Sequence, residues 1–356
     1  MPPTPHRPRF ALALAGTLTL TAALAGCGGT GTAGGDGRVV TVYSADGLKG
    51  TSAEGWYDAQ FKAFEKQTGI TVKYVEGGSG EIVQRAVREK NNTQADVLVT
   101  LPPFIQQAEG EGLLEPYKPR GWGKVAAADK AADGSWTSLV KNYAGFIRNS
   151  EKLSQKPETW RDLLDEKYQD KLQYSTPGVA GDGTAVLIKA MHDFGGLKPA
   201  MDYFEKLQEN NVGPSSSTSK LGPKVDKGEL LVANGDVQMN FAQARSMPNL
   251  DIWFPAREGG EPSTFALPYA AGLTKSAPQS ENGKKLLDFL LGKKAQLDVS
   301  ATGGGFPART DVDPEDENAA ALDRIMEGVK VFRPDWRKID RNYDTYIDAW
   351  EGATGS

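Results

Sequence analysis

The sequence predicts an α/β protein of two lobes, each a mainly parallel sheet flanked by helices. Three observations support this prediction. Apolar, β-branched runs alternate with stretches whose apolar residues recur at helical spacing, Gly- and Ser-rich turns separate them, and the pattern starts again near residue 142. Strands this apolar, alternating with helices, are typical of parallel sheets covered on both faces. The 356 residues, 39% of them hydrophobic, are enough for one or two packed domains.

The N-terminus has the pattern of a signal peptide over residues 1–26. Two arginines precede an apolar run over residues 10–24, which is shorter than the ~20 residues that a membrane span needs. The Leu-Ala-Gly-Cys sequence that ends at Cys27 resembles the lipobox of bacterial lipoproteins, which implies cleavage before Cys27 and acylation of its thiol. We therefore expect an exported protein, anchored by lipid at the outer face of the cytoplasmic membrane.

The chain after the leader is expected to divide into a tether and two lobes. Residues 27–37 hold the lipidated cysteine and then almost only Gly, Thr and Ala, a composition typical of flexible linkers. We assign residues 38–141 and 270–356, with the C-terminal helices, to lobe 1 and residues 142–269 to lobe 2. The formal net charge is −5 and no basic tract follows the leader, which argues against nucleic acid as a partner.

In the first lobe, small polar turns follow three predicted strands. Strands are predicted over residues 39–43, 70–75 and 95–100, and helices over residues 56–67 and 81–90. The turns that follow the strands are residues 44–47, 77–80 and 100–103. Because ligands of open α/β sheets bind beyond the carboxyl ends of the strands, we expect these turns to line a ligand crevice.

The second lobe repeats the pattern and returns to the first. Its strands are predicted over residues 143–148 and 232–242, its helices over residues 159–164, 183–194 and 199–210, and a returning strand over residues 265–274. A helix over residues 282–291, a glycine loop at 303–305 and an aromatic-striped helix over residues 336–350 follow, and we expect this last helix to pack on the body. Two crossing segments predict a cleft between the lobes, a favoured place for small ligands.

Two predicted helix starts have the chemistry of anion capture. Ser79 and Gly80 open one helix and Thr184 lies at the start of another, so that free N–H groups, a hydroxyl and the helix dipole point at one place. The alternative is that Ser79 and Thr184 only cap their helices. Asp46 has two interpretations as well, a turn-stabilising residue or a partner for a cation of the ligand, and spacing alone favours the turn.

Enzyme signatures occur only as isolated matches. Residues 29–34 fit GxGxxG without a flanking strand or helix, and residues 217–220 fit SxxK without its companion motifs. The single histidine after the leader, His192, lies inside a predicted helix and gives little support to a Ser-His-Asp triad. We therefore expect no catalytic residue, no cofactor and no metal. The rival interpretation, a secreted hydrolase, needs a nucleophile beside a base, and no such pair can be assembled.

Residues 39–114 strongly resemble the solute-binding proteins of 2-aminoethylphosphonate ABC importers, a group related to ferric-iron and thiamine binders. The resemblance lies in VVTVYSADG, YVEGGSGEIVQRAVREK and QADVLVTLPPFIQQAEGEGLL, and it continues more loosely through residues 145–194 and 265–309. It implies a two-lobed, type II periplasmic-binding-protein fold that closes on its ligand. It also implies a monomeric receptor for 2-aminoethylphosphonate or a close organophosphonate, working with ABC permease and ATPase subunits.

The resemblance also implies a set of ligand-binding residues. It places Ser44, Ala45, Asp46, Ser79, Gly80 and Thr100 on the first lobe, Thr176 and Thr184 on the second, and Tyr269 near the returning crossover. We expect Asp46 to accept the ammonium group, and Ser79, Thr176 and Thr184 to hold the phosphonate. Ferric-iron relatives use adjacent tyrosines where this chain has residues 240–243, and none is present there. A phosphorylated metabolite, thiamine or a polyamine remain alternative cargoes, and a sensory or adhesive role remains an alternative to transport.

Overall fold

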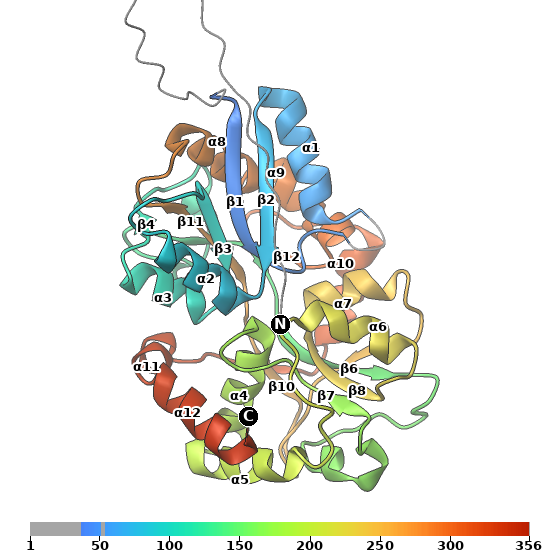
Figure 1. Ribbon diagram of the computed structural model, residues 1–356. Coiled ribbons are helices and arrows are strands. Elements are labelled where there is room, and N and C mark those ends of the chain that lie inside the picture. The colour runs from blue at the N-terminus through green and yellow to red at the C-terminus, as the bar shows by residue number, and fades with distance from the viewer. Residues whose placement is uncertain (1–36, 51–53, 356) are drawn as a thin grey trace, which may run out of the picture. The chain divides into compact units, whose positions relative to one another are not determined.

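The computed structural model describes residues 37–50 and 54–355, and residues 38–355 form two α/β lobes (Figure 1). The predicted signal peptide, Cys27 and the tether up to residue 36 lie outside the described residues. In the part of the chain that the structure describes, no helix has both the length and the apolar character needed to cross a membrane.

The first lobe is built on a seven-stranded sheet with the order β12-β5-β11-β3-β1-β2, in which β4 also pairs with β11. Its strands are β1 (Val39–Ala45), β2 (Thr71–Gly77), β3 (Val97–Thr100), β4 (Leu114–Glu115), β5 (Thr137–Lys141), β11 (Tyr269–Thr274) and β12 (Phe306–Pro307). β1 runs parallel to β2 and β3, whereas β11 runs antiparallel to β3 and β5. The sheet is therefore mixed rather than mainly parallel, because β11 enters it from the side of the other lobe.

Helices cover both faces of this sheet. They are α1 (Trp56–Thr68), α8 (Ser280–Leu290) and α9 (Lys293–Asp298) on one face, and α2 (Ser79–Arg88) and α3 (Phe104–Gly110) on the other. Val40 and Val42 of β1 pack with the first group, while Tyr43 packs with the second. Successive side chains of a strand point to opposite faces, so β1 contributes to both cores. Both faces are buried, which explains the uninterrupted apolar runs in the sequence.

The second lobe has a four-stranded sheet with the order β7-β8-β6-β9. Its strands are β6 (Ala144–Asn149), β7 (Leu172–Gln173), β8 (Val232–Asp236) and β9 (Leu250–Trp253), and its helices are α4 (Gly181–Asp193), α5 (Leu197–Leu207), α6 (Leu221–Asp226) and α7 (Val237–Ala244). β6 runs antiparallel to β8 and β9, and only β7 and β8 are parallel, so the predicted parallel sheet is wrong here too.

The strand predicted over residues 232–242 ends early, at Asp236. The Oδ1 atom of Asp236 accepts a hydrogen bond from the backbone N–H of Met239 at 2.7 Å and so caps α7. A capping aspartate satisfies an N–H group that has no partner within the helix. The apolar residues after Asp236 therefore form a helix that directly follows the strand.

Two adjacent segments connect the lobes. One joins β5 to β6 at residues 142–143, and the other joins β10 (Ser263–Phe265) to β11. Tyr143 and Ala266 form an antiparallel bridge, and the backbone N–H of Leu267 donates to the Asn142 carbonyl at 2.8 Å. The two crossings predicted from the sequence therefore lie side by side.

The C-terminal segment contacts both lobes. It contains α10 (Glu317–Met326), β13 (Lys330–Phe332), which pairs with β10, α11 (Trp336–Arg341) and α12 (Tyr343–Thr354). Tyr343 packs edge-on against Phe104 of the first lobe, whereas the indole N–H of Trp350 donates to the Tyr174 hydroxyl in the second-lobe core at 3.2 Å. The aromatic stripe packs on the body, as predicted. However, it spans two helices, and α12 lies against α5 of the second lobe rather than on lobe 1.

The remaining helices are short. They are the 3-10 helices Trp122–Lys124, Ala127–Asp129, Arg161–Leu164, Glu166–Tyr168 and Thr218–Lys220, and the π-helix Val299–Gly303.

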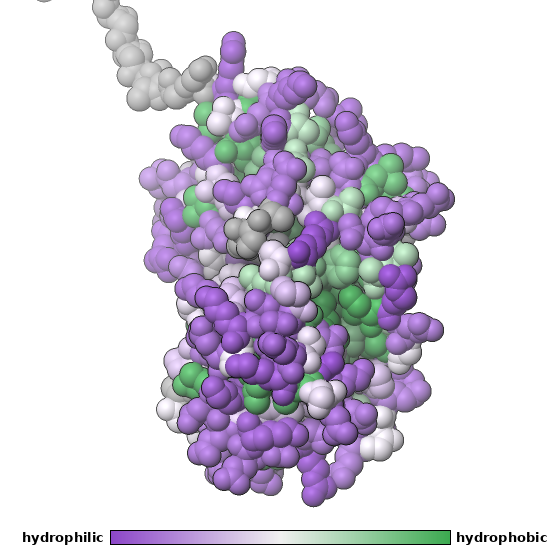
Figure 2. Space-filling view, turned by 90° about the vertical axis from the view of Figure 1, so that its right-hand side faces the viewer, coloured by the Kyte–Doolittle hydropathy of each residue, from purple (hydrophilic) through white to green (hydrophobic). Residues whose placement is uncertain are grey.

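In the view of Figure 2, hydrophobic side chains gather at mid-height between two largely hydrophilic masses.

Candidate functional site

The two lobes contact each other directly at the carboxyl end of β1 and the start of α2. The backbone N–H of Gly80 donates to the Val179 carbonyl at 3.2 Å. The Ser217 hydroxyl donates to Oδ2 of Asp46 at 2.5 Å, and Nε2 of Gln238 donates to the Gly47 carbonyl at 3.1 Å. The crevice predicted at the ends of the strands is therefore closed by the second lobe.

The first turns of α2 and α4 meet across this interface. A Cβ atom on Gly181, the first residue of α4, would lie 2.6 Å from Oγ of Ser79, the first residue of α2. A Cβ atom on Gly80 would lie 2.5 Å from the Gly178 carbonyl oxygen. Glycine at both positions therefore permits the two helix starts to approach. The positive dipole ends of two helices therefore converge there, an arrangement suited to an anion.

Two hydroxyl residues predicted at the first-lobe wall hydrogen-bond to that wall. The Ser44 hydroxyl donates to the Ala45 carbonyl at 2.8 Å and lies 3.3 Å from the Tyr57 hydroxyl. The Thr100 hydroxyl donates to the Ser79 carbonyl at 3.1 Å. Ser44, Ala45 and Thr100 are fully buried. These contacts hold the end of β1 and the start of α2 in position, whereas the Ser79 hydroxyl makes no hydrogen bond within the described residues.

Asp46 is held by residues from two other parts of the chain. Besides its carboxylate bond to Ser217, its backbone carbonyl accepts a hydrogen bond from the Tyr269 hydroxyl at 2.9 Å. Burial is the largest cause that raises the pKa of Tyr269, and the carboxylates of Asp236, Asp182 and Asp46 raise it further. Tyr269 therefore stays protonated and acts as a donor to Asp46, which brings β11 beside the end of β1.

The two threonines predicted on the second lobe are bonded to turns of that lobe. Oγ1 of Thr176 accepts a hydrogen bond from the Ser215 N–H at 3.2 Å. Oγ1 of Thr184 accepts one from the Gly178 N–H at 3.0 Å and donates to the Ala180 carbonyl at 3.2 Å. Both hydroxyls therefore shape the turns around the start of α4.

Two acidic residues that the sequence analysis missed are buried in the same region. The side chain of Asp182, in the first turn of α4, and that of Asp236, at the end of β8, belong to residues only 5% and 1% exposed. Among the described residues, Oδ1 of Asp182 and Oδ2 of Asp236 have no hydrogen-bond partner. An acid in a first turn and an aspartate at an N-cap are common structural features, so neither gives a functional signal on its own.

The carboxyl groups of this region repel one another. Burial raises the pKa of Asp182 well above its ordinary value, and the nearby Asp236 and Asp46 raise it further. Burial also raises the pKa of Asp236, against the lowering effects of the Met239 N–H and of Asn142. Within residues 37–50 and 54–355, no ion pair involves any of the three aspartates. The carboxylate cluster of Asp46, Asp182 and Asp236 thus has no countercharge from the described chain.

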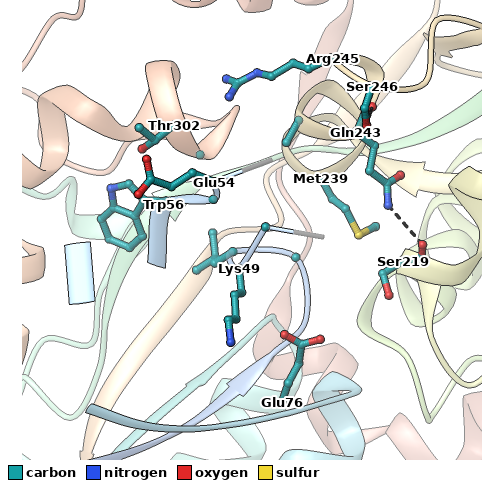
Figure 3. Close-up of a pocket in the computed structure, with 16 residues that line it drawn as sticks. Lys49, Glu54, Trp56, Glu76, Ser219, Met239, Gln243, Arg245, Ser246 and Thr302 are labelled. Carbon is teal, nitrogen blue, oxygen red and sulfur yellow. Dashed lines mark hydrogen bonds between the residues drawn. The ribbon is translucent and has the colours of Figure 1, made fainter. Parts of the chain in front are cut away.

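A pocket lined by both lobes lies beside this closed interface (Figure 3). It holds about 560 Å³ of space, part of it open to solvent. Lys49 and Glu76 line it from the first lobe and Arg245, the residue after α7, from the second, so its wall carries charges of both signs. Gly47, the residue after Asp46, also lines it. So does Met239, which lies shortly after Asp236 in the chain. The pocket therefore adjoins the carboxylate cluster along both chain segments.

Two residues of the isolated enzyme motifs have clear structural surroundings. Ser217 of the SxxK match bonds to Asp46 and lies 2.8 Å from the Ser219 hydroxyl, so it belongs to the interface between the lobes. The ring of His192 stacks on Phe332 with 3.6 Å between the centroids. His192 thus lies on α4, as predicted, with its side chain 48% exposed and one ring face covered.

Comparisons with known proteins agree with this architecture. A family model described as bacterial extracellular solute-binding protein matches residues 92–342. The chain is 51% identical over 318 residues, covering 89% of this chain and 93% of the other, to a Salmonella typhimurium (strain LT2) protein named "Putative 2-aminoethylphosphonate-binding periplasmic protein".

Solved structures show the same fold at low sequence identity. The periplasmic binding protein AfuA from Actinobacillus pleuropneumoniae, with exogenous fructose-6-phosphate bound, is 21% identical with a TM-score of 0.76, covering 89% of this chain and 99% of that one. A periplasmic thiamin binding protein is 19% identical with a TM-score of 0.73, covering 89% and 96%. The fold is that of the type II periplasmic binding proteins, as the sequence predicts.

Proposed function

We propose that this chain, which belongs to the family of bacterial extracellular solute-binding proteins, captures 2-aminoethylphosphonate or a close organophosphonate for an ABC importer. The family consists of binding proteins that act outside the cytoplasm, so the chain is a binding protein rather than an enzyme. The observation that carries the choice of ligand is the 51% identity to the named Salmonella protein, which extends over nearly the whole of both chains.

The geometry between the lobes supplies chemistry for both ends of such a ligand. The phosphonate would lie at the meeting point of α2 and α4, where N–H groups and the Ser79 hydroxyl can donate to its oxygen atoms. The ammonium end would lie toward Asp46, beside Gly80 and Tyr269. Thr176 and Thr184 would support this site through the turns before α4 and after residue 213. Closure of the lobes would then bury a ligand that contacts both of them.

The attachment and the partners belong to the same proposal. Acylated Cys27 would hold the protein at the outer face of the cytoplasmic membrane, with residues 28–37 as a tether. The protein would work as a monomer that delivers its ligand to separate ABC permease and ATPase subunits. The resemblance of the lipobox and the family of the folded part support this arrangement.

A thermal-shift experiment tests the ligand. The exported chain carrying Cys27→Ser, which we expect to be released from membranes, is titrated with 2-aminoethylphosphonate, phosphate, thiamine and Fe(III). A ligand that binds only the folded state stabilises it by about 2.7 kcal/mol at 100 times its Kd, so 2-aminoethylphosphonate should raise the melting midpoint progressively. A response to one of the other compounds, with none to 2-aminoethylphosphonate at millimolar concentration, would contradict the proposal.

A further inference from the structure

We propose that Asp182 and Asp236 form an ammonium subsite that makes the cleft selective for phosphonates carrying a primary amine. The inference rests on the proposed function, since it takes the phosphonate end as given and names the residues that distinguish amine-bearing ligands from others. Nothing in the local sequence of either residue assigns this role.

Asp182 and Asp236 each have a buried carboxylate oxygen that lacks a hydrogen-bond donor within the described residues. Each residue is more than nine-tenths buried, and each has one oxygen without a hydrogen-bond partner among the described residues, Oδ1 of Asp182 and Oδ2 of Asp236. A buried acceptor without a donor costs about 1 to 3 kcal/mol, and more when it is charged. Buried polar atoms in native proteins nearly always have a partner, so these two atoms call for an outside donor.

A third unpaired acceptor lies close to the cluster. Gln238 is 1% exposed, and its Nε2 donates to the carbonyls of Gly47 and Gly303, while its Oε1 has no partner in the described structure. A Cβ atom on Gly47, the residue after Asp46, would lie 3.5 Å from this oxygen. Among the described residues of this region, these three unpaired acceptors face one unpaired donor, Nδ2 of Asn142. A primary ammonium group brings three donors and no acceptor.

The negative charges of Asp182 and Asp236 also favour a cation at this place. Burial raises the pKa values of both Asp182 and Asp236, and the neighbouring Asp236 raises that of Asp182 further, so their ionised forms are disfavoured where they lie. A cation placed between them would remove this penalty, because an opposite charge within a few ångströms favours the ionised form. The start of α4 adds a favourable dipole for the carboxylate of Asp182. A ligand ammonium therefore offsets the charge penalty of the buried pair on the second lobe.

The contacts of Asp46 distinguish its role from that of the pair. Asp46 is partly exposed, and its Oδ2 already accepts the Ser217 hydroxyl across the interface. We assign it to the connection between the lobes and to the negative field of the site. Oδ1 of Asp46 belongs to a partly exposed residue that solvent can reach, whereas the unpaired oxygens of Asp182 and Asp236 are buried, so the pair and not Asp46 alone should set the preference for an amine.

Calorimetry with two ligands tests the proposal. Binding of 2-aminoethylphosphonate and of ethylphosphonate, which lacks the amine, is measured on the wild type, Asp236→Asn and Asp182→Asn. Asparagine keeps the size of the side chain, and its carbonyl can still cap α7 at position 236. Each variant should bind 2-aminoethylphosphonate at least about 30-fold more weakly, because one partner of a buried charge pair is lost, while ethylphosphonate changes by less than about 3-fold.

The matched control is Asp335→Asn, the same substitution at the N-cap of α11, where Oδ1 accepts the Lys338 N–H at 3.0 Å. It should leave both affinities unchanged. Equal losses for the two ligands in both Asp182→Asn and Asp236→Asn, with cooperative unfolding retained, would overturn the ammonium subsite and make the pair a structural element. Failure of the wild type to bind either phosphonate would instead overturn the proposed function, so the two failures are distinguishable.

Discussion

The two ends of α4 bury charged residues in opposite ways. Near its C-terminal end, the Nζ atom of Lys189 lies 2.5 Å from Oδ2 of Asp193, and the side chains of this pair are 1% and 5% exposed. Lys189 also donates to the Pro255 carbonyl and to Ser263, and Trp160 donates to Asp193, so the buried charges are paired and hydrogen-bonded.

At the N-terminal end the buried charge is not compensated. Asp182 has Asp236 and Asp46 as neighbours, all of the same sign, and two carboxylate oxygens lack donors within the described residues. Burying a charge is expensive unless it is paired, so one protein helix shows both solutions. The paired charges of Lys189 and Asp193 therefore stabilise the fold, whereas the unpaired carboxylate cluster is available to a cation from outside.

The largest change in the free energy of unfolding is expected when the buried Lys189–Asp193 ion pair is broken. Lys189→Met should destabilise the protein by about 3 to 5 kcal/mol, because it leaves the Asp193 carboxylate buried without its cation. Urea unfolding of the two proteins measures the difference. Lys198→Met is the matched control, since the Lys198–Asp202 pair on α5 has the same spacing but is largely exposed and should contribute less than about 1 kcal/mol. Similar small losses for both variants would remove the contrast between paired structural charge and the unpaired cluster.

An intermediate effect should follow from blocking the approach of the lobes at Gly181. In Gly181→Ala the new Cβ would lie 2.6 Å from Ser79 Oγ and 2.7 Å from Leu101 Cδ1, both on the opposite lobe. Overpacking of this kind costs about 1 to 3 kcal/mol, so ligand affinity should fall roughly 10- to 100-fold while each lobe stays folded. Calorimetry with 2-aminoethylphosphonate checks this.

The control for Gly181→Ala is Gly352→Ala in α12, where an added Cβ meets no atom within 4 Å. It should leave affinity unchanged. If Gly181→Ala also bound normally, the carboxylate cluster would not need the closed arrangement, and the comparison of the two ends of α4 would lose its meaning for ligand binding.

The smallest effect concerns stability without ligand and its dependence on pH. A carboxyl whose pKa rises on folding binds its proton more tightly in the folded chain, so the protein loses stability as pH increases through that raised pKa. Asp182 and Asp236 are in this situation, facing Asp46 and the Tyr269 hydroxyl. Asp182→Asn should therefore stabilise the unliganded protein by about 1 kcal/mol at pH 7.5, because it removes a buried carboxylate oxygen without a donor, and the gain should vanish near pH 4.

Unfolding measured between pH 4 and pH 8 checks this sign against another buried acid. Asp96 is 1% exposed, but both of its oxygens accept backbone N–H groups, from Thr41 and Gln279. Asp96→Asn should destabilise at every pH, because the amide replaces one acceptor with a donor. A destabilised Asp182→Asn at pH 7.5 would show that its carboxylate has partners in the folded protein and would weaken the ammonium subsite.

Much of the fold was predictable because its signals are local. The apolar periodicity placed β1, α1, β2 and α2 within a few residues, and glycine at position 69 marked the end of α1. The prediction of a mainly parallel sheet was wrong because strand direction depends on where the chain re-enters a lobe, and periodicity is the same in both directions. The prediction of a strand over residues 232–242 was wrong after Asp236, because the side chain of Asp236 caps α7 and the chain continues as a helix.

The candidate site, like the fold, was predictable from the sequence only in part. Sequence alone determined the alternating strands and helices, the small polar turns at the strand ends, and, through resemblance, the family and the positions of Asp46, Ser79 and Tyr269. Only the tertiary structure decided that Asp182 and Asp236 lie together, since they belong to elements far apart in the chain. Each looks ordinary in its own segment, and a lone acid is satisfied by solvent. Burial beside a second acid, without a cation, arises only when α4 packs on β8 in the folded second lobe, and this is what turns the two aspartates into a candidate for binding an amine.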